Sequence, residues 1–220
     1  MGDQVRDASG AKPCNRIFHL HYHVPDISYA EDALAAYRLP LHARFGWVDE
    51  EIIALRPEDD TPDDFQFRLQ DSQRGYANVT LTSGKKVQFD HLGIISDDFE
   101  GITERADTAG WGVQGIDEPR TFLFTPWGFR VEIHPEGNRV EESLGPWEDC
   151  RFKEVILTAP DKESVEDGFE TVIGPLPQLS IQSGYEQVEV PKASLTGNSV
   201  ESPIVLQSSH LSDSTTTNEA

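Results

Sequence analysis

The sequence predicts an α+β fold built from repeated βαβββ modules, and three observations support this prediction. Residues 87–136 contain an apolar strand-like run, then a helix-like stretch, then further strand-like runs. The same order of strand, aspartate and helix occurs three times along the chain. Each copy also has an ionisable side chain at the matching position of its first strand. A repeat of this size indicates duplicated supersecondary units.

The second copy shows the pattern most completely. Its first strand-like run, VQFDHLGI, carries His91. The helix-like stretch 99–110 ends in a glycine, as helices often do, and the strand-like runs 121–125 and 129–133 are joined by a Pro-Trp-Gly turn. Glu132 lies inside the last apolar run, where an ionised side chain is costly unless it is paired or bound to a metal. This copy therefore places a histidine on its first strand and a glutamate on its last.

The three copies align from the first strand to the start of the helix. The aligned first-strand residues lie 72 and 63 positions apart, and an aspartate follows each of them after seven positions. These residues are His19, His91 and Glu154, the aspartates are Asp26, Asp98 and Asp161, and the helix-like stretches are 29–38, 99–110 and 162–173. Because the third copy has glutamate where the others have histidine, we expect it to lack a complete second site.

The repeat predicts a division of the chain into segments. They are a flexible leader at 1–14, a paired βαβββ domain at 15–136, a linker at 137–149, a partial third module at 150–207 and a disordered, Ser/Thr-rich tail at 208–220. The first module has strand-like runs at 47–55, 65–69 and 77–82, and the third has weaker ones at 178–181, 186–190 and 204–207.

The charge balance limits the kinds of molecule that the protein is expected to bind. The chain has 39 acidic and 18 basic residues, which gives a formal net charge of −21. Such a surface repels phosphate groups, so we expect neither a nucleic acid nor a membrane as partner. Lysines number six. An acidic, lysine-poor surface fits either a halophilic protein, in which salt screens self-repulsion, or an ordinary acidic protein.

The remaining composition favours a cytoplasmic protein. No apolar run approaches the length of a transmembrane helix, and the N-terminal residues lack the apolar region of a signal peptide. Cys14 and Cys150 are too few for a disulfide framework. We expect a monomer or homodimer that binds a small-molecule substrate.

One strand carries histidines at alternate positions. His19, His21 and His23 lie in RIFHLHYHVPD and share one face, because strand side chains alternate. His19 is either a satisfied core histidine or a metal ligand, and His21 competes with it for the ligand role. His21 and His23 are candidate catalytic acid/base groups, because histidine titrates near neutral pH, or else they line a polar interior.

Two residues share the face of Glu132 on its strand. Arg130 could pair with a substrate anion or with a nearby acid. His134 stands near the strand end, so it is predicted to be a solvated rim residue that could meet substrate.

Three stretches carry a resemblance to a known family. They are the HLHYHVPD that starts at His19, the DHLGI around His91 and the PWGFRVEI that contains Glu132. Together they resemble the vicinal oxygen chelate superfamily, which includes glyoxalase I, fosfomycin-resistance proteins and extradiol ring-cleaving dioxygenases. The resemblance implies the glyoxalase/bleomycin resistance/dihydroxybiphenyl dioxygenase-like fold, in which βαβββ sheets wrap around a cavity with one divalent metal.

The resemblance also implies a set of metal ligands. His19, His91 and Glu132 match the family's ligand positions. Glyoxalase-like members have a fourth ligand on the last strand of the first module, and the matching residue here is Thr80, which is not an acid. Two histidines and one carboxylate are the set that suits non-haem Fe²⁺ with open coordination positions. Zn²⁺, Ni²⁺ and Mn²⁺ are the alternatives.

These expectations favour a metal-dependent enzyme that acts on a small catechol-like or vicinal-oxygen substrate. An Fe(II)-dependent ring-cleaving dioxygenase is preferred, because the fourth ligand of the glyoxalases is missing. A glyoxalase-type lyase or isomerase is the alternative, and a metal-free small-molecule binding protein of the same fold is the second alternative.

Overall fold

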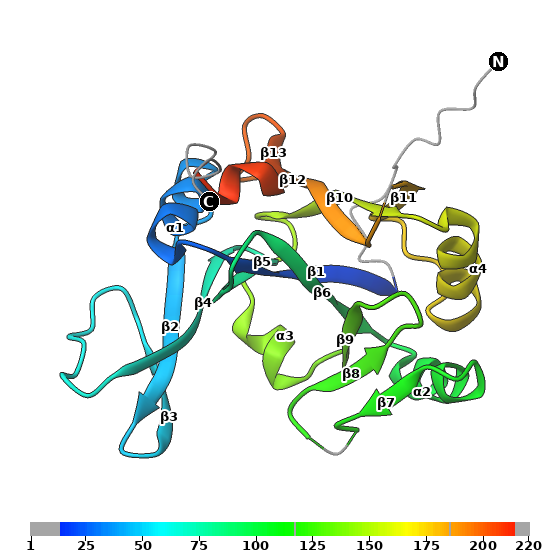
Figure 1. The fold of residues 1–220 in the computed structure, drawn as a ribbon, viewed down its shortest axis with the longest axis horizontal. Coiled ribbons are helices and arrows are strands. Elements are labelled where there is room, and N and C mark those ends of the chain that lie inside the picture. Colours follow the sequence, from blue (N-terminus) through cyan, green and yellow to red (C-terminus); the bar gives the residue numbers. More distant parts are fainter. Residues whose placement is uncertain (1–13, 117, 185, 214–220) are drawn as a thin grey trace.

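The computed structural model describes residues 14–116, 118–184 and 186–213. Figure 1 shows two β-sheets and several short helices. The larger sheet has nine strands and the smaller has four. The α+β class and the repeated βαβββ order are confirmed. None of the helices in the described ranges is long and apolar enough to cross a membrane.

The nine-stranded sheet is built from residues 15–135. Its strands are β1 (Asn15–Val24), β2 (Leu41–Val48), β3 (Glu51–Leu55), β4 (Gln66–Arg74), β5 (Ala77–Ser83), β6 (Gln88–Ser96), β7 (Gly112–Gln114), β8 (Thr121–Phe124) and β9 (Arg130–Pro135). Their spatial order is β3-β2-β4-β5-β1-β6-β9-β8-β7. The antiparallel pair of β1 and β6 lies at the centre. Each of them pairs in parallel with the last strand of its own half, β5 or β9. The two histidine-bearing first strands therefore lie side by side.

The four-stranded sheet repeats the centre of the larger one in reduced form. Its strands are β10 (Arg151–Ala159), β11 (Leu179–Ser183), β12 (Glu189–Thr196) and β13 (Ile204–Gln207), in the order β11-β10-β12-β13. β10 pairs in parallel with β11 and antiparallel with β12, as β1 does with β5 and β6. In the small sheet, β12 thus occupies the place that β6, the first strand of the second half, has in the large sheet. It does not occupy the place of the second strand of a module.

The helices explain the repeated aspartates. They are α1 (Ile27–Ala36), α2 (Phe99–Thr108), α3 (Arg139–Ser143) and α4 (Lys162–Val172), followed by a 3₁₀ helix, η1 (Ser208–Leu211). Asp26 and Asp161 are N-caps whose carboxylates accept hydrogen bonds from backbone N–H groups of the first turn. Asp98 is the N-cap of α2 but forms an ion pair with Arg105 instead. The repeated aspartate therefore has a structural role, which is to start a helix after each first strand.

A β-bulge occurs at the same place in each of the three repeats. Phe18 in β1, Asp90 in β6 and Lys153 in β10 are each passed over in the strand register. Each bulged residue directly precedes the repeat position, which is His19, His91 or Glu154. Bulges re-aim neighbouring side chains and often lie beside functional sites.

The core lies between the two sheets. Leu20 and Tyr22 of β1 are buried in the same apolar cluster as Val155 and Leu157 of β10. The Gln178 side chain joins the sheets by hydrogen bonds to the backbones of β1 and β10. Because side chains alternate along β1, its three histidines lie on the opposite face from this core.

One predicted strand was wrong in detail. The run 47–55 is not one strand but the end of β2, a tight turn and β3. Asp49 and Glu50 form the turn with φ of 47° and 67°, values that usually favour Asn or Gly and were therefore not expected from this sequence.

The segments outside the paired domain also hold more structure than predicted. The expected linker 137–149 contains α3 and the buried Trp147. The expected disordered tail begins with η1, whose Leu211 is buried against the main core. Residues 1–13 of the expected leader and 214–220 of the tail lie outside the described residues.

Candidate metal centre

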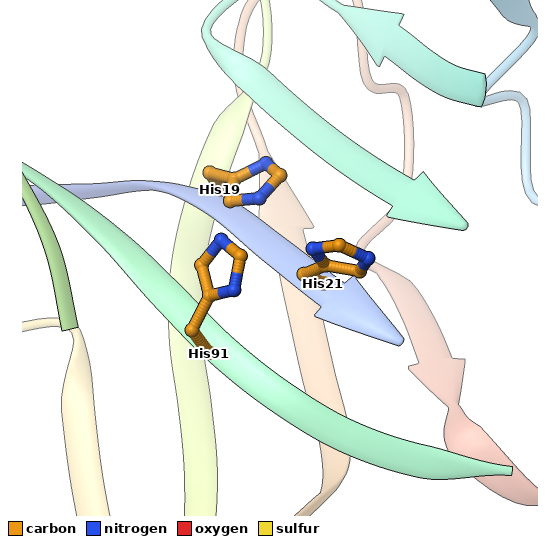
Figure 2. Close-up of side chains that lie close together, drawn as sticks. All are labelled: His19, His21 and His91. Atoms are coloured by element: carbon orange, nitrogen blue, oxygen red, sulfur yellow. The ribbon is translucent and has the colours of Figure 1, made fainter. Parts of the chain in front are cut away.

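Three imidazoles converge on the face of the large sheet that is turned away from the core. His19 and His21 come from β1 and His91 from β6, as Figure 2 shows. One potential ligand atom from each lies within 4.8 Å of the others, and all three residues are buried. The ring of His91 lies 5.1 Å from that of His19 and 4.7 Å from that of His21, centroid to centroid. Among the described residues, this is the one group of three or more such side chains with this spacing.

The strand register explains the convergence. His21 stands directly opposite His91 in the β1–β6 pair, and His19 stands opposite Gly93. A Cβ atom on Gly93 would lie 2.6 Å from the Phe18 ring and 2.8 Å from the Cβ atom of His19. Glycine at this position therefore leaves room for the two histidine strands to approach.

Glu132 extends the group from β9. Its Oε2 atom lies 3.0 Å from Nε2 of His91, and its Oε1 atom lies 2.7 Å from Nε2 of His134. Burial alone would raise the pKa of Glu132, but the hydrogen bonds from His134 and His91 hold that pKa well below its usual range. The carboxylate is therefore ionised at neutral pH, although the residue is almost fully buried, with only 3% of its surface exposed.

The first predicted ligand, His19, is held by a relay of side chains. Nδ1 of His19 lies 2.8 Å from Oδ1 of Asn78, and Nδ2 of Asn78 donates to Asp71 at 3.0 Å. The amide oxygen of Asn78 can only accept, so Nδ1 carries the proton and Nε2 is left as a potential ligand. Burial and the nearby His91 lower the pKa of His19 to about 3. The imidazole is thus neutral, as metal binding requires.

The second predicted ligand, His91, is held by the residue before it. Nδ1 of His91 lies 2.8 Å from Oδ2 of Asp90, which also pairs with Arg130. Burial would lower the pKa of His91, but Asp90 and Glu132 together raise it above its usual value. Nε2 of His91 is the atom that faces Glu132. The two histidines therefore present the same ring nitrogen to the centre, each fixed through Nδ1 by a neighbour.

The two predicted catalytic histidines differ in position. His21 belongs to the imidazole group, its Nε2 lies 3.1 Å from the Thr82 hydroxyl and its Nδ1 lies 3.6 Å from Asp90. Burial, with help from His91 and His19, lowers the pKa of His21 to about 2. His23 contacts the same hydroxyl at 2.8 Å, but its side chain is 38% exposed. His21 is thus part of the centre, and His23 lies at its margin.

The prediction that His134 is a solvated rim residue was wrong. His134 is 1% exposed and lies between Glu132 and Asn138, which donates to its Nδ1 at 2.9 Å. Asn138 is also the N-cap of α3. The sequence did not reveal this contact because α3 lies in the segment expected to be a linker. Arg130 forms an ion pair with Asp90. This agrees with one of the two roles proposed for it, that of pairing with a nearby acid.

Thr80 occupies the place in the first half that Glu132 occupies in the second. Glu132 pairs with Gly93, two residues after His91, and Thr80 pairs with His21, two residues after His19. Thr80 is buried, and its hydroxyl contacts Asn78. The centre therefore has one carboxylate where a symmetric site would have two.

A cavity of about 130 Å³ adjoins the centre. Its lining includes His19, Thr80, Asn78, Glu132 and Asp71. Oδ1 of Asp71 is buried without a hydrogen-bond partner in the described structure. Buried imidazoles, an ionised carboxylate and an unsatisfied acceptor nearby are a donor set that fits one divalent transition-metal ion.

Comparison with known proteins gives a fold match but no sequence match. Neither a family model nor a curated protein sequence matches the chain. The Mn(II)-bound glyoxalase from Novosphingobium aromaticivorans is similar with a TM-score of 0.56 and 15% identity, over 79% of this chain and 63% of that one. The 2,3-dioxygenase LapB from Pseudomonas sp. KL28 is similar with a TM-score of 0.51 and 12% identity, over 80% of this chain and 72% of that one.

The match to the glyoxalase spans less than two thirds of that protein's length. The likeness is therefore one of architecture, and it agrees with the paired βαβββ halves described above. The chain has the fold of the vicinal oxygen chelate superfamily.

Proposed function

We propose that this protein is a mononuclear metal enzyme in which His19, His91 and Glu132 hold one divalent cation and a small oxygenated molecule is the substrate. The observation that carries the proposal is the 3.0 Å approach of His91 Nε2 to an ionised, buried Glu132, with the His19 ring 5.1 Å from that of His91. His91 and Glu132 are joined by a hydrogen bond in this structure. A metal ion placed near the two atoms could bind both of them in place of that hydrogen bond.

The three-histidine group offers a competing ligand set, with His21 in place of Glu132. Two observations favour Glu132. Its charge offsets that of a divalent cation in a buried place, where an uncompensated charge is costly. Nε2 of His21, in addition, already contacts the Thr82 hydroxyl. We assign His21 to the substrate side, where its neutral ring can form a hydrogen bond with a substrate hydroxyl; its Nδ1 lies 3.6 Å from Asp90.

A bound divalent metal would act as a Lewis acid that stabilises negative charge on the substrate oxygens. The protein's own part is to position these groups. Asn78 and Asp90 fix the rings of His19 and His91, and His134 fixes the carboxylate of Glu132. Such outer contacts set both the orientation and the basicity of ligands.

The preferred reaction is Fe(II)-dependent ring cleavage of a catechol-like substrate, in which O2 supplies both inserted oxygen atoms. Its support is the ligand set of two histidines and one carboxylate, with Thr80 where a fourth ligand would stand. This set leaves positions for substrate and oxygen. A second candidate is glyoxalase-type proton transfer between adjacent carbons, which the likeness to a Mn(II)-bound glyoxalase favours. A metal-free binding protein would have no need of a buried, ionised glutamate beside three histidines.

Anaerobic reconstitution tests these alternatives. Protein loaded separately with Fe²⁺, Mn²⁺, Ni²⁺ or Zn²⁺ is mixed with a panel of catechols in an oxygen electrode. We expect O2 uptake with the Fe²⁺ form, one O2 for each ring cleaved, and none with a Glu132→Ala variant. Turnover of vicinal-oxygen substrates without O2 uptake, fastest with Mn²⁺, Ni²⁺ or Zn²⁺, would instead establish the isomerase. If the protein retains none of these metals, the metal-free binding protein is the remaining hypothesis.

A further inference from the structure

A large groove lies outside the metal cavity. Its volume is about 570 Å³, which is within the usual range for a small-molecule site. Its lining comes from strands β2, β3 and β4, and from β7, β8 and residues between those two strands. Phe45, Leu69 and Arg120 line both the groove and the smaller cavity beside His19 and Glu132. A ligand in the groove can therefore extend to the metal centre.

The groove has apolar walls. Phe45, Ile52, Leu69 and Phe122 all line it. Ile52 is 51% exposed, which is unusual for a large apolar side chain. The Phe122 ring lies edge-on to the ring of His91, with 5.3 Å between centroids. Phe122 thus continues the apolar wall from the groove to the candidate metal ligand.

Two arginines stand among these apolar side chains. Arg68 is exposed, and a β-bulge in β4 places it beside Leu69, because the register passes from Phe45–Leu69 directly to Gly46–Phe67. Arg120 is also exposed, and its Nε atom is 3.6 Å from Glu132. Glu118 is the one acid in the lining.

Arg68 is not neutralised by a nearby acid among the described residues, although the protein is strongly acidic. With 39 acids and 18 bases in the chain, carboxylates are plentiful, and Arg44, Arg105 and Arg130 each form an ion pair. Within the described part of the chain, the Arg68 side chain forms no hydrogen bond or ion pair. An arginine that faces a groove in this way is available to a ligand.

We propose that the groove binds the carboxylate of an aromatic substrate, which Arg68 and Arg120 hold while the ring lies against Phe45 and Phe122. This inference rests on the proposed function for its catalytic end, because it places the oxygen-bearing end of the same substrate at the metal centre. Arginine suits this task, since its planar guanidinium makes two parallel hydrogen bonds to a carboxylate. The substrate is then an aryl acid rather than an uncharged catechol or aldehyde.

The test uses metal-free protein, so that it does not depend on catalysis. The binding of 3-phenylpropanoate and of its neutral amide, 3-phenylpropanamide, is measured by calorimetry at one fixed ionic strength. We expect the acid to bind about 10-fold more tightly than the amide, because a charge-assisted contact contributes roughly 1.5 kcal/mol or more. The Arg68→Gln variant should lose most of this preference, because only Arg120 then remains to hold the carboxylate, and its affinity for the acid should fall more than its affinity for the amide.

The controls separate the charge of Arg68 from its general effect on the protein. Lys153→Gln removes one positive charge from an exposed position on β10, in the other sheet, and should keep the preference. Arg68→Lys should keep part of it, because the charge remains but the two-pronged contact is lost. Circular dichroism confirms that each variant is folded.

Equal affinity for acid and amide in the wild type would overturn the inference, as would an unchanged preference in Arg68→Gln. Tighter binding of phenylethylphosphonate than of the carboxylate would also overturn it, because the recognised anion would then be a phosphonate. These outcomes leave the proposed function intact if the protein still binds metal and turns over uncharged catechols. Conversely, a protein that binds aryl acids but no metal would retain the inference about the groove and lose the proposed function.

Discussion

The Oδ2 atom of Asp90 lies 2.8 Å from Nδ1 of His91, although the two residues are consecutive in one strand. Consecutive side chains of a regular strand point to opposite faces. The bulge at Asp90 lifts this restriction and lets the carboxylate reach the ring of its neighbour. The same bulge recurs before His19, where Phe18 takes the place of the acid. Both halves thus have the bulge before the repeat histidine, but only the second half has a carboxylate, that of Asp90, at the bulge.

Replacement of Asp90 should weaken metal binding without unfolding the protein. In Asp90→Asn the charge that holds Nδ1 of His91 is lost, and outer-shell changes of this kind typically cost about 10- to 100-fold in metal affinity. The measurement is a Zn²⁺ titration against a chelator of known affinity. Asp60→Asn, at an exposed loop position, is the matched control and should bind as the wild type does. An Asp90→Asn variant with wild-type affinity would contradict this role.

The relay from Asp71 through Asn78 to His19 should behave as one unit. Asn78→Ala removes the acceptor for Nδ1 of His19, and we expect metal affinity to fall by about 10-fold. Asp71→Ala should have a smaller effect, because Asp71 reaches His19 through Asn78. The double variant should bind no more weakly than Asn78→Ala alone. Additive losses would show that the two residues act independently, and the visible spectrum of the Co²⁺ form would report any change around His19.

The sequence was sufficient for the parts of the fold that rest on local chemistry. The N-capping aspartates and the alternating histidines each mark a local structure, so the repeat, the helices and the histidine face could be predicted. The family resemblance predicted Thr80 at the position of the fourth ligand, and the register places it where Glu132 stands in the other half.

The missed features depend on contacts between distant segments. The burial of His134 requires α3, whose five residues are too few to give a periodic signal. The turn at Asp49 and Glu50 has a conformation that the surrounding strands impose. The pairing of β10 with both β11 and β12 is a matter of sheet topology, which the apolar pattern of each strand does not encode.

A salt titration tests the interpretation of the acidic surface. If the net charge of −21 is a halophilic adaptation, screening should relieve self-repulsion and raise the melting temperature by roughly 5 °C or more between low and molar KCl. Sucrose is the control, because it stabilises by exclusion from the surface and not by screening. A melting temperature that does not change with KCl would favour an ordinary acidic protein.

Acid should weaken the contact between α3 and β1. Burial would raise the pKa of Glu141, but hydrogen bonds from Gly137, Tyr76 and Arg16 lower it from 4.5 to about 2. A lowered folded-state pKa contributes stability that is complete above about pH 4.5 and is lost as the pH falls through about 2. Glu141→Gln should therefore cost about 2 kcal/mol at pH 7.

The pH dependence distinguishes this charge effect from lost packing. Urea unfolding of wild type and Glu141→Gln, measured from pH 7 to pH 2, should show a difference that shrinks as the wild-type carboxylate becomes protonated. A difference that stays constant over this range would mean that the substitution acts through packing alone.

The metal content of anaerobically Fe²⁺-reconstituted protein tests the central claim most directly. We expect about one metal ion per chain in the wild type and in His21→Ala, and almost none in His91→Ala or Glu132→Ala, because a three-residue site does not survive the loss of a ligand. Circular dichroism of each variant provides the check on folding. Full occupancy in Glu132→Ala together with loss in His21→Ala would contradict the account and assign the site to the three histidines.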